Sequence, residues 1–360
     1  MQQYLRVGLS RGPGELSMID TSALLQTVRL LAMRTSLPEG RELAEVFSEA
    51  AGVLENLPVL ERPRASDGRA GGLVELDALL PTLILPDLHA RPSLLLDLLE
   101  TTIPDTGVLV VDGLARQEIQ VLMLGDGPHT EGPLAKPRWQ KAWEEFQTDW
   151  KTSSAMKEEM TLAFNAMEMV ARLISVFPGH FFFLKGNHDN ILNQDGGGNH
   201  SFGKYAYEGL MAFLWTQDFL GEEFLSAYDG FERALPLVAR GRGFLATHAE
   251  PAFAITVTDA VEARLRPEII EALTWTANDA ADPEAVDSTL AAFVDPADLP
   301  GLAFGGHRPV HNRFSLRSEG RFVQIHDVDH HQAALVFPGQ SFDPVTGIID
   351  LGKTDAAAER

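Results

Sequence analysis

Five short apolar segments of the chain each end in polar residues of the kinds that bind metal ions. These residues are two carboxylates, one amide and four imidazoles: Asp87, His89, Asp126, Asn187, His188, His248 and His307. Such groups suit Mn, Fe, Zn and similar divalent ions, and the chain has no cysteine to supply a thiolate. The set is too large for one tetrahedral site and suits two ions, which a carboxylate can bridge. Two such ions activate water for attack at phosphorus.

Each of these residues also has an ordinary structural explanation when it is taken alone. A single histidine after a strand is usually a surface or core group, and Asp126 in Gly-Asp-Gly-Pro suits a turn. Asn187 is equally suited to an ordinary loop. The coincidence of five segments favours the metal site, because the other histidines mostly lack this placement. They are His129, His180, His200, His311, His326, His330 and His331.

The elements that must position these groups are visible as short apolar runs. Runs of three to four residues have the length of buried strands, and they lie at 82–85, 121–124, 181–184, 244–247 and 302–304. Helical stretches separate them, the longest spanning about 138–177, with its Trp and Met residues spaced for core packing. The alternation predicts an α/β fold whose ligands gather at the carboxyl ends of the strands.

The chain divides by pattern into three parts. We expect a helical N-terminal extension and linker at 1–72, packed on the core, because apolar residues recur at helical spacing within 15–60. The main domain spans 73–340, and 341–360 forms a C-terminal tail. Within the domain, 133–177 is expected to be a helical insertion. A structural role for it is favoured over that of a lid that selects the substrate.

Composition limits the partners of the protein. Acidic residues outnumber basic ones by 51 to 29 among 360 residues, and the formal net charge is -22. Such a surface repels nucleic acids and anionic lipids, so neither partner is expected, and an anionic substrate needs a cation in the site. No apolar run of about 18 residues occurs, which predicts a cytoplasmic protein without a membrane span. The oligomeric state stays open.

The ordered motifs resemble those of the calcineurin-like metallophosphoesterases. They are Asp-Leu-His at 87–89, Gly-Asp at 125–126, Gly-Asn-His-Asp at 186–189, Thr-His-Ala-Glu-Pro at 247–251 and Gly-His-Arg-Pro at 306–309. A finer resemblance is to the phosphoprotein phosphatase branch, which includes serine/threonine phosphatases and diadenosine-tetraphosphate hydrolases. It rests on Leu-Pro at 235–236 and on Leu-Thr-Trp at 273–275. The resemblance implies a central β-sandwich flanked by helices.

The resemblance also assigns roles. The implied ligands of the first metal are Asp87 and His89, the bridging ligand is Asp126, the ligands of the second metal are Asn187, His248 and His307, and the general acid is His188. An imidazole titrates in the range that suits protonation of the leaving oxygen. The implied cofactors are two divalent ions, with manganese expected and iron or zinc as alternatives.

The chain departs from the family pattern where phosphate is bound. After Gly125-Asp126 the family has Asp and Arg, but His129 and Thr130 occupy these positions, and 280–304 contains no arginine where the branch has a second one. The candidates for binding the substrate are therefore Arg308, Arg91 and His129. Arginine is favoured because its planar guanidinium binds phosphate oxygens in pairs.

The resulting expectation is a hydrolase that cleaves a phosphate ester by attack of a hydroxide shared by two metal ions. The expected substrate is a phosphoprotein or a small phosphate ester. One alternative is a nucleotide or diadenosine-polyphosphate hydrolase. Another is a degenerate, weakly active member of the family that serves as a binding module, which the missing arginines favour and the intact ligand set opposes.

Overall fold

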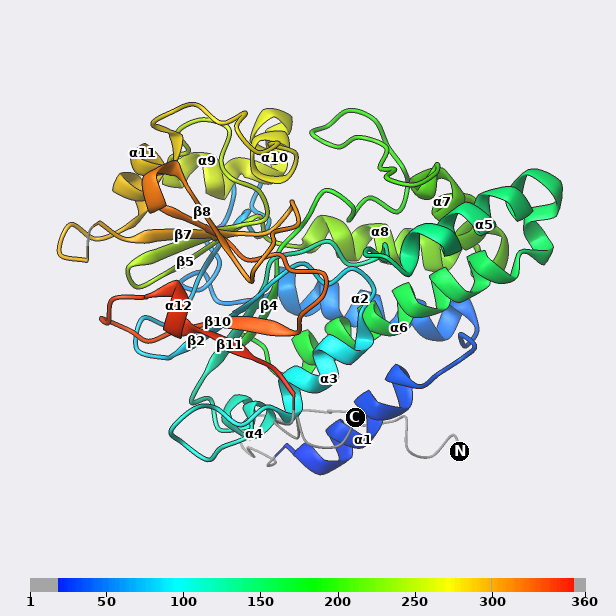
Figure 1. Cartoon of the computed structure of the whole chain (residues 1–360), viewed down its shortest axis with the longest axis horizontal. Coiled ribbons are helices and arrows are strands. Elements are labelled where there is room, and N and C mark those ends of the chain that lie inside the picture. The colour runs from blue at the N-terminus through cyan, green and yellow to red at the C-terminus, as the bar shows by residue number, and fades with distance from the viewer. Residues whose placement is uncertain (1–18, 299, 353–360) are drawn as a thin grey trace.

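The chain folds into two β-sheets that pack together and are flanked by helices (Figure 1). The computed structural model describes residues 19–298 and 300–352, so predictions that concern 1–18 and 353–360 lie outside the described residues. Two stacked sheets with helices on both sides are the architecture that the sequence predicts. The alternation of apolar strands and helices predicts the α/β class, and the two packed sheets are what the family resemblance implies.

One sheet has six strands in the order β1-β5-β6-β7-β9-β8. The strands are β1 (Leu73–Glu75), β5 (Val238–Gly241), β6 (Phe244–Thr247), β7 (Leu302–Gly305), β8 (Ser315–Arg317) and β9 (Phe322–Gln324). The neighbours β6, β7 and β9 run parallel to one another. Their carboxyl ends therefore share one edge of the sheet, at which the residues that follow them meet.

The other sheet has five strands in the order β11-β10-β2-β3-β4. The strands are β2 (Thr82–Leu85), β3 (Gln120–Met123), β4 (Phe181–Phe183), β10 (Gln332–Val336) and β11 (Ile348–Asp350). Again the strands that lead into predicted ligands, β2, β3 and β4, are parallel. Because β11 pairs with β10, the sheet continues beyond the predicted boundary at residue 340, and 341–350 belongs to the domain rather than to a tail.

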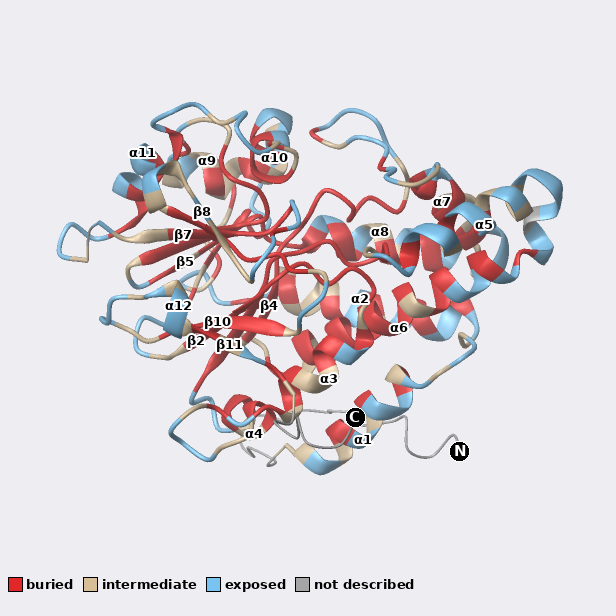
Figure 2. Cartoon of the chain, in the orientation of Figure 1, coloured by how far each residue is buried: buried red, intermediate tan, exposed pale blue. Residues whose placement is uncertain are grey.

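Alternate residues of the six-stranded sheet face two different cores, as the period of a strand requires. Ala246, Phe304 and Val323 join the large core between the sheets, whereas Leu245, Ala303 and Phe322 join a second core on the outer face. That outer face is covered by α9 (Val257–Glu262), α10 (Pro267–Thr274) and α11 (Ala285–Phe293), at the upper left of Figure 1. Figure 2 shows most of the strands as buried, whereas β8 and β11 at the sheet edges are partly exposed.

The remaining helices lie beside the five-stranded sheet. They are α3 (Pro92–Glu100), α4 (Val110–Ala115), α5 (Ala135–Asp149), α6 (Ser154–Val176), α7 (Glu208–Phe219), α8 (Gly221–Ala234) and the short α12 (Pro344–Gly347). Of the 3₁₀ turns, η2 (Trp150–Thr152) follows α5, whereas η3 (Ala263–Leu265) contacts α9 and α10, and η4 (Ser318–Gly320) contacts β8 and β9 of the six-stranded sheet. The predicted long helix at 138–177 is thus two helices. The first, α5, ends at Asp149. Ser153 caps the start of the second, α6, where its hydroxyl accepts the Met156 N–H at 3.1 Å. Across the described ranges, no helix is long and apolar enough to cross a membrane.

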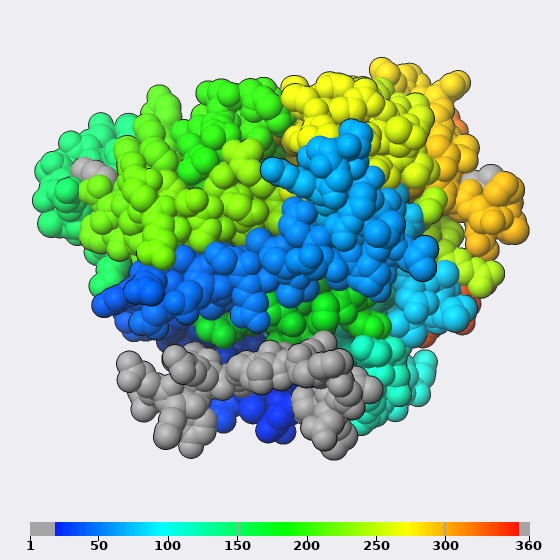
Figure 3. Space-filling model, turned by 180° about the vertical axis from the view of Figure 1, so that it is seen from behind, coloured from blue at the N-terminus to red at the C-terminus, as the bar shows by residue number. Residues whose placement is uncertain are grey.

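The two N-terminal helices, α1 (Thr21–Ala32) and α2 (Gly40–Glu55), pack on this helical layer. Figure 3 shows α2, in blue, within a band across the rear of the molecule. Phe47 of α2 is fully buried, and its ring lies 4.7–5.8 Å from the rings of Phe224, Tyr228 and Phe231 on α8. The N-terminal extension therefore shares the core of the domain.

Replacing Phe47 by Ala should destabilise the whole domain, because the cavity would open at the contact between α2 and α8. We expect a loss of about 3–5 kcal/mol in the free energy of unfolding, measured by urea titration. The control is Glu49→Ala on the exposed face of the same helix, which should change it by less than about 0.5 kcal/mol. A Phe47→Ala variant as stable as this control would show that α2 is dispensable.

Candidate metal centre

The carboxyl ends of strands from both sheets meet at one edge of the sandwich, and there they bring together all six predicted metal ligands. Each of these residues is at most 9% exposed: Asp87, His89, Asp126, Asn187, His248 and His307. The four ligands on the side of the five-stranded sheet follow the parallel strands β2, β3 and β4, and the two histidines on the other side follow β6 and β7. These six side chains therefore lie close together at this edge, which makes them candidates for holding metal ions.

One group of ligand atoms surrounds the carboxylates that follow β2 and β3. His89 Nε2 lies 3.8 Å from Asp87 Oδ2 and 3.7 Å from Asp126 Oδ2. Two atoms that each bind one ion at about 2.0–2.2 Å are separated by such distances. These three side chains can therefore hold one divalent ion.

A second group lies on the other side of Asp126. His248 Nε2 is 3.5 Å from Asp126 Oδ2 and 3.0 Å from Asn187 Oδ1, and His307 Nδ1 is 2.9 Å from the same amide oxygen. Asp126 Oδ2 is thus within 4 Å of ligand atoms from both groups. A bridging role for this carboxylate agrees with the geometry.

Backbone carbonyls orient two of the imidazoles toward the centre. His89 Nδ1 donates to the carbonyl of His129 and His248 Nδ1 donates to the carbonyl of Leu124, both at 2.8 Å. In each ring the Nε2 lone pair is left to face the carboxylates. Such an outer hydrogen bond fixes the tautomer and the orientation of a metal-binding histidine.

The backbone at the ligands is held in a sparsely populated conformation. His89, Asp126 and His307 have φ angles of 43°, 52° and 63°, in the left-handed region that most residues avoid. Two glycines allow the close packing of these loops. A Cβ on Gly306 would lie 1.7 Å from Asp87 Oδ1, and one on Gly186 would lie 2.1 Å from Asp126 Oδ1. Strain of this kind is typical of functional sites.

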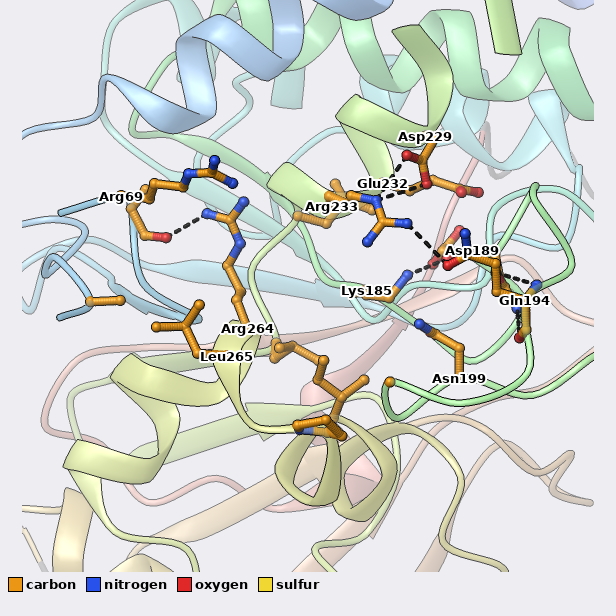
Figure 4. Close-up of a pocket in the computed structure, with 18 of the residues that line it drawn as sticks. Arg69, Lys185, Asp189, Gln194, Asn199, Asp229, Glu232, Arg233, Arg264 and Leu265 are labelled. Carbon is orange, nitrogen blue, oxygen red and sulfur yellow. Dashed lines mark hydrogen bonds and ion pairs between the residues drawn. The ribbon is translucent and has the colours of Figure 1, made fainter. Parts of the chain in front are cut away.

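Asp189, the residue that follows Asn187 and His188, holds their loop in place. The Asp189 carboxylate accepts the N–H groups of Asp126, Gly127 and Gly186 at 2.7–3.1 Å. The Lys185 ammonium donates to the carbonyl of Asp189, as Figure 4 shows from the side of an adjoining pocket of about 280 Å³. That pocket is lined by Lys185 and Asp189 but by none of the predicted ligands, so it lies outside the metal centre.

The electrostatics of the cluster favour a bound cation. Burial, together with the carboxylates of Asp126 and Glu131, raises the pKa of Asp87 well above its usual range. Burial also pushes up the pKa of Asp126, but His248 and His89 outweigh this effect and hold it below its usual range. Divalent ions would neutralise these crowded acids.

Two of the imidazoles are also in the state that a metal requires. Burial lowers the pKa of His89 well below its usual range and that of His307 to about 2, so both are neutral at physiological pH. Asp87 Oδ1 and His89 Nε2 are buried without a hydrogen-bond partner among the described residues. Neutral imidazoles and unpartnered oxygens are the donors that a divalent ion binds.

His188, the predicted general acid, lies at the edge of the cluster. Its Nδ1 is 3.6 Å from Asp126 Oδ2, and its side chain is 11% exposed, compared with 2% for His89. The ring of His129 lies 4.6 Å from that of His188, and His129 Nε2 is 3.6 Å from Glu208 Oε1. His129, which is predicted to bind the substrate, is therefore fully buried beside His188.

Thr130 occupies the position where the family pattern has an arginine, and it bonds away from the ligands. Its hydroxyl donates to Glu159 of α6, a carboxylate that also pairs with Arg138 of α5. Trp139 of α5 donates to Thr130 Oγ1 at 3.1 Å and stacks on the ring of His129. Helices α5 and α6 thus contact the loop that follows Asp126 and support it.

The two candidate arginines lie in different environments. The guanidinium of Arg91 donates to the backbone carbonyls of Leu88, Asp87 and Asp327 at 2.6–3.2 Å. This is a correction to the sequence analysis, because the nitrogens of Arg91 tie the loop after β2 to 327 instead of facing a phosphate. Arg308 is exposed and directly follows His307, so it stays a candidate.

Two further residues of the centre are absent from the predicted set. His326, two residues beyond β9, is fully buried, with Nδ1 3.8 Å from Asp87 Oδ2. Glu131 Oε2 lies 3.4 Å from His326 Nε2 and 3.8 Å from His89 Nε2. The signal in the sequence is an apolar run at 322–325 that ends in His326, but Gln324 interrupts it.

Comparison with known proteins shows a likeness in fold alone. No protein-family model matches the sequence, and no curated protein matches it. The structure is similar to a protein serine/threonine phosphatase from Saccharomyces cerevisiae with similarity to human phosphatase PP5. The TM-score is 0.55 at 14% identity, over 88% of this chain and 90% of that chain. A protein tyrosine phosphatase from a psychrophilic Shewanella aligns with a TM-score of 0.41 at 12% identity, over 80% and 83%. The predicted α/β fold, with two packed sheets, is confirmed.

Replacing Gly306 by Ala should disrupt the centre, since the new methyl group would collide with Asp87 Oδ1. We expect the variant to lose most of its bound manganese after dialysis against the ion, measured by inductively coupled plasma mass spectrometry. Gly52→Ala in α2 is the control, because a Cβ there meets nothing within 4 Å. Equal manganese content in the two variants would contradict the tight packing of the loops at the metal ligands.

Proposed function

We propose that the chain is a metal-dependent phosphoesterase that uses two divalent ions, with manganese preferred. The observation that carries the proposal is the position of Asp126 Oδ2 within 4 Å of His89 on one side and His248 on the other. The likeness in fold to a serine/threonine phosphatase and the motif resemblance both support it. Asp87 and His89 would hold one ion. Asn187, His248 and His307 would hold the other, and Asp126 would contact both.

When bound, the two ions supply an activated water and offset the charge of the phosphate. The chain itself contributes the leaving-group proton, which we assign to His188. Burial lowers the pKa of His188 well below its usual range, but the negative charge of a bound phosphate ester acts in the opposite direction. Protonation of the leaving oxygen by an imidazole of this kind typically contributes 10²–10⁴-fold to the rate.

His129 and Glu208 are placed to support His188. The stacked Trp139 and the Glu208 carboxylate fix the ring of His129 directly against the ring of His188. Because it is fully buried, His129 serves as a positioning residue in this proposal rather than as a direct contact of the phosphate. Arg308, exposed beside His307, is the guanidinium that we assign to the phosphate oxygens.

The proposed substrate is a phosphomonoester, with phosphoproteins as the class. A second candidate is a phosphodiester or polyphosphate, as in a nucleotide hydrolase. The observation that favours it is Glu131, whose carboxylate is only 5% exposed and faces His89. A buried negative charge there opposes a phosphomonoester dianion more strongly than a singly charged diester.

Chelation should abolish hydrolysis of p-nitrophenyl phosphate, and added manganese should restore it.

Asp126→Asn should lower kcat/KM by at least about 100-fold, because the amide lacks the charge that both ions share. The matched control is Asp105→Asn, an exposed aspartate whose φ of 62° is also left-handed. Activity that resists chelation, or an Asp126→Asn variant as active as the control, would contradict the proposal. A higher kcat/KM for bis(p-nitrophenyl) phosphate than for the monoester would favour the second candidate.

His188→Asn should affect substrates according to their leaving groups. An alkyl phosphate needs the donated proton, so its kcat/KM should fall about 10²–10⁴-fold, whereas p-nitrophenyl phosphate should lose much less. Manganese content should stay close to that of the unmodified protein. His180→Asn, at the opposite end of β4, is the control and should change neither rate. An equal loss on both substrates would show that His188 has a structural or metal-binding role instead.

A further inference from the structure

We propose that His326 is a ligand of the first metal ion and that Glu131 holds it in place. The inference rests on the two-metal centre proposed above and extends it. The first ion would then be bound by four side chains of this chain: Asp87, His89, Asp126 and His326. This histidine lies outside the motifs that carry the family resemblance, and it follows β9, a strand that none of those motifs follows.

The register of the six-stranded sheet explains why His326 reaches the centre. Gln324 of β9 pairs with Gly305 of the parallel strand β7. His326 and His307 therefore lie two residues beyond paired positions, on neighbouring loops at the same edge. The Ile325 N–H donates to the Gly305 carbonyl at 2.9 Å, and the Val310 N–H donates to the His326 carbonyl at 2.8 Å. These bonds fix the backbone on both sides of the ring.

The atoms of the ring are arranged as a metal ligand requires. His326, His89 and Asp87 each offer a ligand atom within 4.8 Å of those of the other two, and His326 Nδ1 and His89 Nε2 each lie 3.8 Å from Asp87 Oδ2. Both of these imidazole nitrogens are buried and have no hydrogen-bond partner among the described residues. A buried nitrogen without a partner is costly, and a shared cation would satisfy both of them together with the carboxylate.

Glu131 determines which nitrogen of His326 faces the centre. His326 Nε2 donates to Glu131 Oε2 at 3.4 Å, which leaves the lone pair of Nδ1 directed at Asp87. Glu131 is itself held by the ammonium of Lys204 at 2.7 Å from Oε1. A carboxylate that accepts from the outer nitrogen is the usual support of a metal-binding histidine.

The neighbouring histidines provide a contrast. His330 Nδ1 lies 3.0 Å from Asp327 Oδ2, and His331 Nδ1 lies 2.6 Å from Asp97 Oδ2. Both rings are partly exposed and already paired with a carboxylate outside the centre. His330 therefore serves as a matched control, since it shares the segment after β9 but does not face Asp87.

The test is titration of metal-depleted protein with Mn²⁺ by isothermal calorimetry, with bound manganese counted by mass spectrometry. We expect the unmodified chain and His330→Ala to bind two ions. His326→Ala should bind one of them at least about 100-fold more weakly, and Glu131→Gln should weaken the same ion by about 10- to 100-fold. His326→Asp, which restores a ligand, should recover much of the affinity lost in His326→Ala.

The outcomes separate the two proposals. If the unmodified chain binds two ions and His326→Ala binds both with unchanged affinity, the role of His326 is wrong and the two-metal centre stands. If the unmodified chain binds no manganese, the proposed function itself fails. Circular dichroism checks the fold of each variant. Should His326→Ala fail to fold, a folded His326→Asp that binds both ions tightly supports ligation, whereas loss of one ion from it overturns the proposal.

Discussion

Crowding of buried carboxylates is the constraint on which the rest of the structure depends. Asp87 and Asp126 are fully enclosed at the junction of the two sheets, with Glu131 close by, and their mutual repulsion adds to the penalty of burial. The same burial lowers the pKa of His89 and His307, so neither imidazole carries a positive charge that would stabilise the ionised form of Asp87. A pair of divalent ions would relieve the repulsion and use every unpartnered donor atom described above.

Several features of the fold hold these carboxylates in place. Parallel strands in both sheets end at one edge, glycines at 186 and 306 let loops approach carboxylates closely, and Asp189 ties three backbone amides together. The three residues after Pro128 each bond to a different support. His129 faces Glu208, Thr130 bonds to Glu159, and Glu131 faces His326 and Lys204. This segment, which departs from the family pattern, is held in place by these internal contacts.

Local patterns in the sequence were sufficient for part of this account. Apolar runs that end in Asp, Asn or His identify both the strands and six ligand-type residues, because strand, turn and ligand are contiguous in the chain. The sequence did not indicate His326, because the preceding strand β9 is short and contains the polar Gln324. The position of His326 at the centre depends on the pairing of β9 with β7. The contacts of Arg91 and the pairing of β11 with β10 likewise depend on segments far apart in sequence.

The central claim is that two divalent ions share Asp126, and a crystal structure of the manganese-loaded protein tests it most directly. An anomalous difference map recorded at the manganese absorption edge shows where the ions lie. The account predicts two peaks, one on each side of Asp126, one beside His89 and the other beside His248. A single peak, or two peaks with Asp126 bound to neither, would contradict it.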